Sequence, residues 1–148
     1  MGEMTETDPA STDGAVARGE AAVKVPMRER IIDAATELFY AHGLRAVSAE
    51  KIIAQVGITK VTFYRHFPTK DELIVAYLER RAKWERDAVT GARQAAADPA
   101  DVFRMVAEAI GAESCRPGFR GCPFINAAAE YADPNHPVRQ VVDTHRRW

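Results

Sequence analysis

Cysteine is scarce in this sequence, whose 148 residues include only Cys115 and Cys122. Two cysteines are too few for a small secreted scaffold held together by disulfides. The sequence also lacks a run of about 18 apolar residues, which a membrane-spanning helix needs. It has no basic start followed by an apolar segment, which a signal peptide needs. We therefore expect a soluble, cytoplasmic protein whose thiols are reduced.

Motifs for catalysis and metal binding are missing as well. No Ser, His and Asp residues stand in an order with supporting context, and no glycine-rich phosphate loop occurs. The two cysteines are not spaced as a C-x₂₋₄-C zinc half-site, and no pair of histidines lies near them. The sequence thus predicts no enzyme, no cofactor and no metal. Two readings of Cys115 and Cys122 stay open: a redox switch, or two unpaired thiols.

Charge is almost balanced over the whole chain, with a formal net charge of −1, but it is unevenly placed. Residues 1–25 carry two basic against five acidic side chains and no aromatic residue, which is typical of a disordered arm. Residues 26–70 carry seven basic against four acidic side chains. A basic segment on a neutral chain is what a small DNA-binding domain requires. We expect residues 71–148 to form a second, regulatory domain.

Helical periodicity extends through the chain from residue 27, and no alternation typical of strands occurs, so the predicted fold class is all-α. After a first helix over residues 27–42, Ser48 is a suitable N-cap for a second helix. Gly57 then permits a left-handed turn, and Thr59 is a suitable N-cap for a third helix, which ends near His66. Two short helices joined by a tight turn make a helix-turn-helix, whose second helix enters the major groove of DNA.

Helices are also expected in the second half of the chain. Thr69 and Glu72 have the spacing of a capping box, so a long helix should begin there and continue to about Val89. Further helices are expected from about Ala100, over about residues 124–131, and from Pro137 onward. These helices would make up residues 71–148.

A known family has the same residues at this point. The segment GITKVTFYRHFPTKDEL, residues 57–73, closely resembles the signature of tetracycline-repressor-like (TetR/AcrR) transcriptional regulators. The resemblance extends from about Arg28 to Leu73, and a weaker one continues through GFRGCPFINAAAEYADPNHPVR, residues 118–139. It implies a homodimer that binds a palindromic operator in double-stranded DNA, usually as a repressor. A small-molecule effector in the C-terminal domain would release the DNA.

The resemblance also implies which side chains contact DNA. Those facing bases would be Lys60, Val61, Thr62 and Arg65. Those facing phosphates would be Ser48, Thr59, Tyr64, His66 and Lys70. For Arg65 a solvated surface charge is the alternative, and for His66 a histidine that merely ends its helix.

An effector pocket is expected from aromatic, apolar and a few polar residues of the second half. The candidates are Trp84, Phe103, Val106, Phe119, Cys122, Phe124 and Asn126. The alternative for these residues is an ordinary filled core, because large apolar side chains more often pack against one another than around a ligand.

The chain ends on the apolar Trp148 without a helix stop signal. Members of the family continue beyond this point with the helices that form their dimer. The sequence is therefore expected to be a truncated member, for which homodimerisation is doubtful. An alternative function follows: a small-molecule sensor or binding protein with weak or no operator binding.

Overall fold

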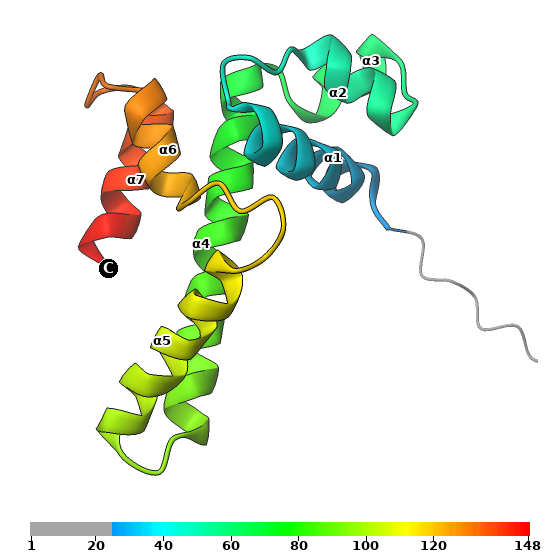
Figure 1. Ribbon diagram of the computed structural model, residues 1–148. Coiled ribbons are helices and arrows are strands. Elements are labelled where there is room, and N and C mark those ends of the chain that lie inside the picture. Colours follow the sequence, from blue (N-terminus) through cyan, green and yellow to red (C-terminus); the bar gives the residue numbers. More distant parts are fainter. Residues whose placement is uncertain (1–24) are drawn as a thin grey trace, which may run out of the picture.

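The computed structural model describes residues 25–148, so the arm expected over residues 1–25 lies, apart from Val25, outside the described residues. The described part contains seven helices and no strand, which confirms the all-α prediction. The helices are α1 (Met27–His42), α2 (Ala49–Val56), α3 (Lys60–His66), α4 (Lys70–Ala95), α5 (Pro99–Ser114), α6 (Pro123–Glu130) and α7 (Pro137–Arg147). Figure 1 shows α1, α2 and α3 gathered at one end of the long α4.

Helices α1–α3 form a small unit with its own core. The side chains of Ile31, Ile52 and Phe63 have no exposed surface and come from the three different helices. The expected caps are confirmed: the Ser48 side chain accepts the backbone N–H of Lys51 and that of Thr59 accepts the N–H of Thr62. Each cap satisfies a backbone donor that has no partner within its helix.

Helix α4 is the element that joins the two halves of the molecule. One half of the expected capping box is present, since Thr69 Oγ1 accepts the backbone N–H of Glu72 at 3.1 Å. The Glu72 carboxylate accepts from the Thr69 hydroxyl, at 3.4 Å, where a complete box would have it accept the backbone N–H of Thr69. The helix continues to Ala95, past the expected end near Val89. Gly91 does not end the helix. The next residue, Ala92, is a strong helix former, and its side chain is buried, which offsets the low helix propensity of glycine. One continuous helix therefore connects α1 with α5 and α7.

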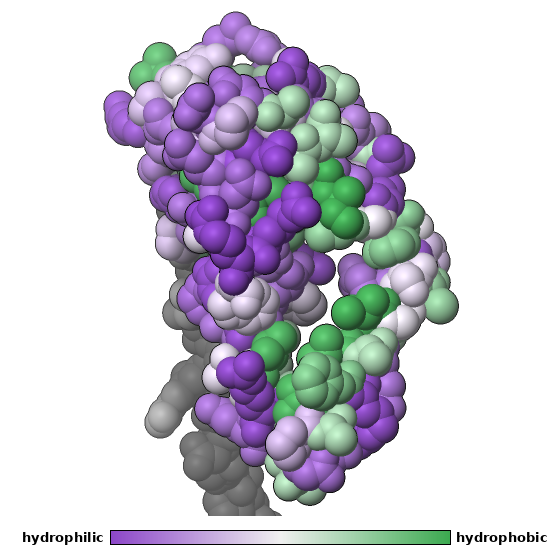
Figure 2. Space-filling model, turned by 90° about the vertical axis from the view of Figure 1, so that its left-hand side faces the viewer, coloured by the Kyte–Doolittle hydropathy of each residue, from purple (hydrophilic) through white to green (hydrophobic). Residues whose placement is uncertain are grey.

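The remaining helices pack on α4 in two places. Helix α5 is capped by Asp98 and begins at Pro99, one residue before the expected start, and none of its residues is buried. Phe103 and Ile110 are 78% and 65% exposed. Figure 2 shows apolar surface gathered on the lower half of the molecule, where α4 and α5 lie. Helices α6 and α7 instead pack closely, and Phe124 and Val142 belong to the main core.

Among residues 25–148, no helix combines the length and the apolar character that crossing a bilayer requires.

Candidate nucleic-acid interface

The turn between α2 and α3 fixes the position of the exposed helix. Gly57 adopts φ 73° and ψ 42°, the left-handed conformation that glycine takes without a Cβ penalty. Its N–H and that of Ile58 both donate to the carbonyl of Ile53, at 3.0 and 3.3 Å. The turn is therefore hydrogen-bonded into the end of α2, and it directs α3 away at a fixed angle.

Helix α3 is short and has a clearly divided surface. Phe63 is fully buried and Phe67, just after the helix, is 2% exposed, so these two rings hold α3 on the core. Val61 is 70% and Tyr64 43% exposed on the opposite side. The rings of Phe63 and Tyr64 meet edge to face at 5.2 Å, which restricts the Tyr64 side chain.

The structure puts the expected base-contacting residues on one helix. Lys60, Val61 and Arg65 are exposed, and Thr62 is half-buried. The Thr62 hydroxyl lies 2.9 Å from that of Thr59, so it is engaged at the N-terminus of the helix.

The residues expected to contact phosphates are spread around α3. Ser48 and Thr59 are exposed N-caps, Tyr64 is exposed, and His66 is half-buried in the last turn. These four side chains lie on α3 or at the N-terminal caps of α2 and α3. Their contacts with the phosphates of a DNA duplex stay a prediction.

One acidic side chain lies beside this surface. Glu50 Oε1 is 3.5 Å from the Nζ of Lys60, and both side chains are mostly exposed. A backbone hydrogen bond and the positive charge of Lys60 hold the pKa of Glu50 below its ordinary value. Lys60 must leave this pair to reach a base, which is easy because exposed ion pairs contribute little.

Lys70 has a role that the sequence did not indicate. Its ammonium group donates to three backbone carbonyls in the loop between α1 and α2: those of Leu44 (2.9 Å), Arg45 (3.3 Å) and Val47 (2.9 Å). An ammonium group has three donors, and all three are used here. The phosphate contact that the sequence led us to expect for Lys70 would require the ammonium group to break at least one of these bonds.

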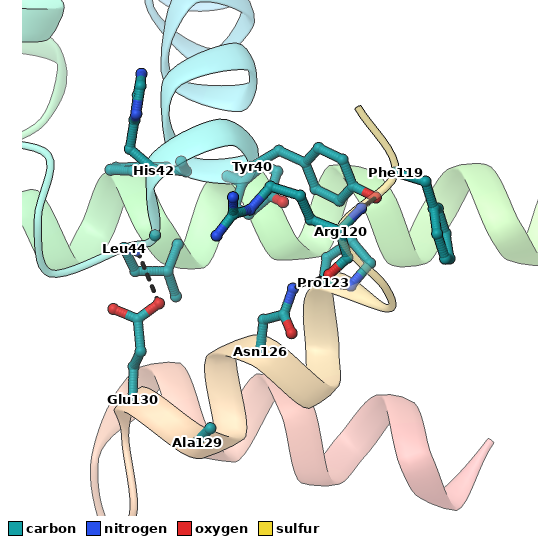
Figure 3. A pocket seen from close by; sticks show the side chains of 12 residues that line it. Tyr40, His42, Leu44, Phe119, Arg120, Pro123, Asn126, Ala129 and Glu130 are labelled. Atoms are coloured by element: carbon teal, nitrogen blue, oxygen red, sulfur yellow. Dashed lines mark hydrogen bonds between the residues drawn. The ribbon is translucent and has the colours of Figure 1, made fainter. Parts of the chain in front are cut away.

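The same loop is held from its other side by Glu130, at the C-terminal end of α6. Its two carboxylate oxygens accept the N–H groups of Leu44 (2.9 Å) and Arg45 (2.7 Å), and Figure 3 shows the carboxylate turned toward Leu44. The Arg45 guanidinium lies over the ring of Tyr131, 4.9 Å from its centroid. Burial, with the negative charge of Asp71 second, raises the pKa of Tyr131 to about 12. Sequence reasoning missed Glu130, since 85 residues separate it from Arg45 and no local pattern links them.

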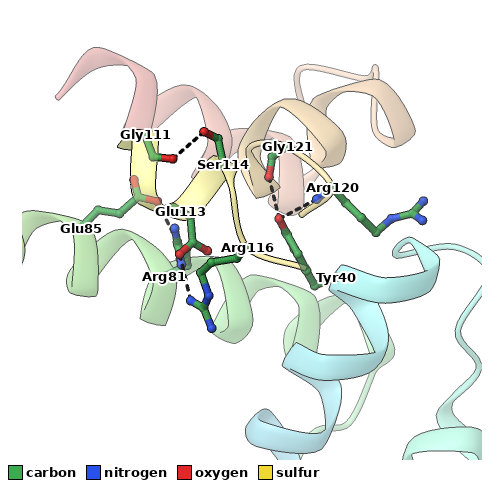
Figure 4. A network of polar contacts seen from close by, with 9 residues as sticks. All are labelled: Tyr40, Arg81, Glu85, Gly111, Glu113, Ser114, Arg116, Arg120 and Gly121. Carbon is green, nitrogen blue, oxygen red and sulfur yellow. Dashed lines mark hydrogen bonds and ion pairs between the residues drawn. The ribbon is translucent and has the colours of Figure 1, made fainter. Parts of the chain in front are cut away.

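Helix α1 has two further connections to the second half. The Arg80 guanidinium donates to Asp33 and to Thr36 Oγ1, each at 2.6 Å. The Tyr40 hydroxyl accepts the N–H of Arg120, at 2.9 Å, and donates to the carbonyl of Gly121, at 3.1 Å (Figure 4). A displacement of α4 or α6 would therefore be transmitted to α1 and to the loop that precedes α2.

The seven residues expected to line one effector pocket do not surround a single hollow in the described part of the chain, and their contact with an effector stays a prediction. Phe119 and Asn126 line a groove of about 570 Å³ between α1 and α6, whereas Phe103 and Val106 line a separate hollow of about 660 Å³ where α4 meets α5. The other three are placed elsewhere for identifiable reasons. Trp84 is 57% exposed on α4, and Cys122 is the exposed N-cap of α6. Phe124 is buried, and its ring centroid lies 3.7 Å from that of His145 in α7.

Comparisons with known proteins agree with the geometry of α1–α4. The profile of the family described as "Bacterial regulatory proteins, tetR family" matches residues 31–77. The HTH-type transcriptional regulator LmrA of Bacillus subtilis is 27% identical over 124 residues, which cover 82% of this chain and 66% of LmrA. The crystal structure of SCO4454, a TetR-family transcriptional regulator from Streptomyces coelicolor, superposes with a TM-score of 0.79 at 45% identity. That match covers 82% of this chain and 64% of SCO4454.

A second solved structure gives the same result. A putative TetR transcriptional regulator from Streptomyces avermitilis superposes with a TM-score of 0.71 at 27% identity, over 81% of this chain and 65% of that one. Profile, sequence relatives and solved structures thus define one class of helix-turn-helix protein. Residues 31–77 thus match the tetR family of bacterial regulatory proteins, and the described residues share the fold of TetR-family regulators. It spans about two thirds of the length of these relatives.

Proposed function

We propose that this protein is a sequence-specific DNA-binding transcriptional regulator, and that it acts as a repressor released from its operator by a small-molecule effector. The observation that carries the proposal is the divided surface of α3. Buried Phe63 fixes this short helix on its core, while Lys60, Val61 and Arg65 extend from its exposed side. Helices presented in this way, after a tight turn, read the major groove.

The side chains of α3 have the chemistry that base reading needs. Lys60 and Arg65 supply donors for the acceptors of guanine, and the branched Val61 supplies an apolar contact for the methyl group of thymine. The exposed hydroxyls of Ser48 and Thr59 supply contacts for phosphates, which position the protein but carry no sequence information. We assign Tyr64 and His66 to phosphates as well.

Regulation requires two such helices at a controlled distance. We propose a homodimer on a palindromic operator, in which the two α3 helices lie about 34–36 Å apart to enter successive major grooves. Helix α4 joins α1 to α5 and α7, so a shift of α4 on effector binding changes that distance. The effector releases the operator if it binds more tightly to the conformation in which the distance between the two α3 helices does not match successive major grooves.

Fluorescence anisotropy tests the proposal with a labelled duplex that the protein has selected from random sequences. Lys60→Ala should lower the preference for the selected duplex over a scrambled one by about 1–3 kcal/mol. Lys83→Ala is the matched control, since Lys83 is an exposed lysine on α4 that pairs with Asp87. Equal losses in both variants would show that α3 supplies only general positive charge, and the base-reading role would be wrong.

A further inference from the structure

The N-terminal end of α2 lies beside the helix that we assign to base reading. Glu50, in the first turn of α2, has its Oε1 3.5 Å from the Nζ of Lys60, the first residue of α3. The two helices contact each other, and Figure 1 shows them together at one end of the molecule. A duplex whose bases meet Lys60 and whose phosphates meet Ser48, the cap of α2, therefore also meets Glu50.

Glu50 is the only acidic residue within residues 48–66, the segment that contains α2 and α3. The same segment contains Lys51, Lys60 and Arg65. The Glu50 side chain is 58% exposed, so it does not fill the core. The phosphates of every duplex repel a carboxylate, so this residue lowers the affinity for DNA in general. At this surface the carboxylate is compensated only where the DNA supplies a hydrogen-bond donor.

The major groove offers two kinds of donor, the N6 amino group of adenine and the N4 amino group of cytosine. The adenine amino group has an acceptor on each side, its own N7 and the O4 of the paired thymine. The cytosine amino group has an acceptor on one side alone, the O6 of the paired guanine. Because acceptors repel a carboxylate, cytosine is the base that suits Glu50.

Lys60 suits the guanine of the same base pair. When its ammonium group turns to the O6 and N7 of a guanine, Glu50 loses the cation that lies 3.5 Å away in the free protein. The paired cytosine presents its amino group directly beside that O6, and the carboxylate can accept from it. Lys60 and Glu50 thus carry, side by side, the donor and the acceptor that one G·C pair requires.

We propose that Glu50 is a specificity-determining residue, which accepts the N4 amino group of a cytosine whose paired guanine binds Lys60. The inference rests on the proposed function, in which α3 lies in the major groove. Glu50 acts mainly by exclusion, because thymine would present its O4 to the carboxylate and guanine its O6. It lowers affinity for all sequences, and least for the sequence that has cytosine at this position.

A purely structural role for Glu50 would leave this preference unchanged. An acidic residue in the first turn stabilises a helix through the helix dipole. A backbone hydrogen bond, followed by the charge of Lys60, holds the pKa of Glu50 below its ordinary value. Both effects belong to the protein and are the same for every duplex. The test therefore compares two duplexes that differ only in the amino group of one cytosine.

Selection from random duplex DNA first locates the base pair: Lys60→Ala and Glu50→Ala should lose preference at one common G·C position. Anisotropy then compares the selected duplex with one in which that cytosine is N4-methylcytosine, which keeps the base pair but replaces the N–H that faces the groove. The unchanged protein should bind the methylated duplex about tenfold less tightly. Glu50→Ala should bind the two duplexes about equally. Glu79→Ala, which removes an exposed carboxylate of α4, is the matched control and should respond as the unchanged protein does.

The outcomes separate this inference from the proposed function. If Lys60→Ala alters the motif while Glu50→Ala, with unchanged circular dichroism, responds to methylation as the unchanged protein does, the Glu50 assignment is wrong and DNA reading by α3 stands. Loss of preference at two separate positions, or at an A·T pair, would overturn the assignment as well. If the unchanged protein enriches no motif, the proposed function fails and the inference fails with it.

Discussion

Replacing Lys70 by methionine removes the ammonium group while keeping a similar length of side chain. Three hydrogen bonds from a charged donor to loop carbonyls are lost. Each such bond contributes about 1.5–3 kcal/mol when buried. The carbonyl of Arg45 is exposed and water can replace the lysine there, so we expect the free energy of unfolding to fall by about 2–4 kcal/mol in total. Urea unfolding followed by circular dichroism measures this loss.

The salt dependence of DNA binding separates the two possible roles of Lys70. A phosphate contact would contribute about 0.9 to the slope of log K against log salt, and that contribution would be lost in the variant. Since all three donors are bonded to carbonyls, we predict a uniform decrease in affinity with an unchanged slope. Lys83→Met controls for the loss of one positive charge. A flatter slope with unchanged stability would refute the role in holding the loop and would favour the phosphate contact.

Three further predictions concern α2 and the turns on either side of it. Glu50→Gln removes the negative charge 3.5 Å from Lys60, so DNA binding should tighten a few-fold in anisotropy titrations at low salt, and a weaker complex would contradict this. Gly57→Ala should cost about 1 kcal/mol of unfolding free energy, because its φ is 73° but a Cβ there meets nothing within 4 Å. Gly43→Ala should lower the free energy of unfolding by more than Gly57→Ala does, because its φ is 93° and an added Cβ would lie 3.2 Å from Glu130 Oε1. If the two variants had equal midpoints of urea unfolding, Glu130 would not hold this loop tightly.

Local signals made most of the DNA-binding unit predictable. Ser48, Thr59 and Thr69 each accept the backbone N–H of the residue three positions further on, so four residues of sequence contain the whole interaction. Gly57 adopts the left-handed conformation that its position indicated. The exposed and buried faces of α3 follow from helical periodicity once these ends are fixed.

Interactions between distant segments were not predictable in the same way. Glu130 and Arg45, which are hydrogen-bonded, lie 85 residues apart in the sequence. Tyr40 and Arg120, which are also hydrogen-bonded, lie 80 residues apart. The residues expected around one effector pocket are separated for this reason: the pattern identified large apolar side chains, but α5 packs on α4 apart from α6, and Phe124 is buried in the core. The end of α4 was misplaced because the penalty of Gly91 was weighed without the buried contact of Ala92.

Selection of binding sites from a pool of random duplex DNA tests the central claim most directly. The protein is incubated with the pool, bound duplexes are amplified, and the enriched sequences are compared with those from Lys60→Ala and Lys83→Ala. The account predicts that the unchanged protein and Lys83→Ala enrich one common motif, and that Lys60→Ala loses preference at defined positions of it. No enrichment by the unchanged protein, or the same motif from Lys60→Ala at undiminished preference, would contradict the claim that α3 reads DNA.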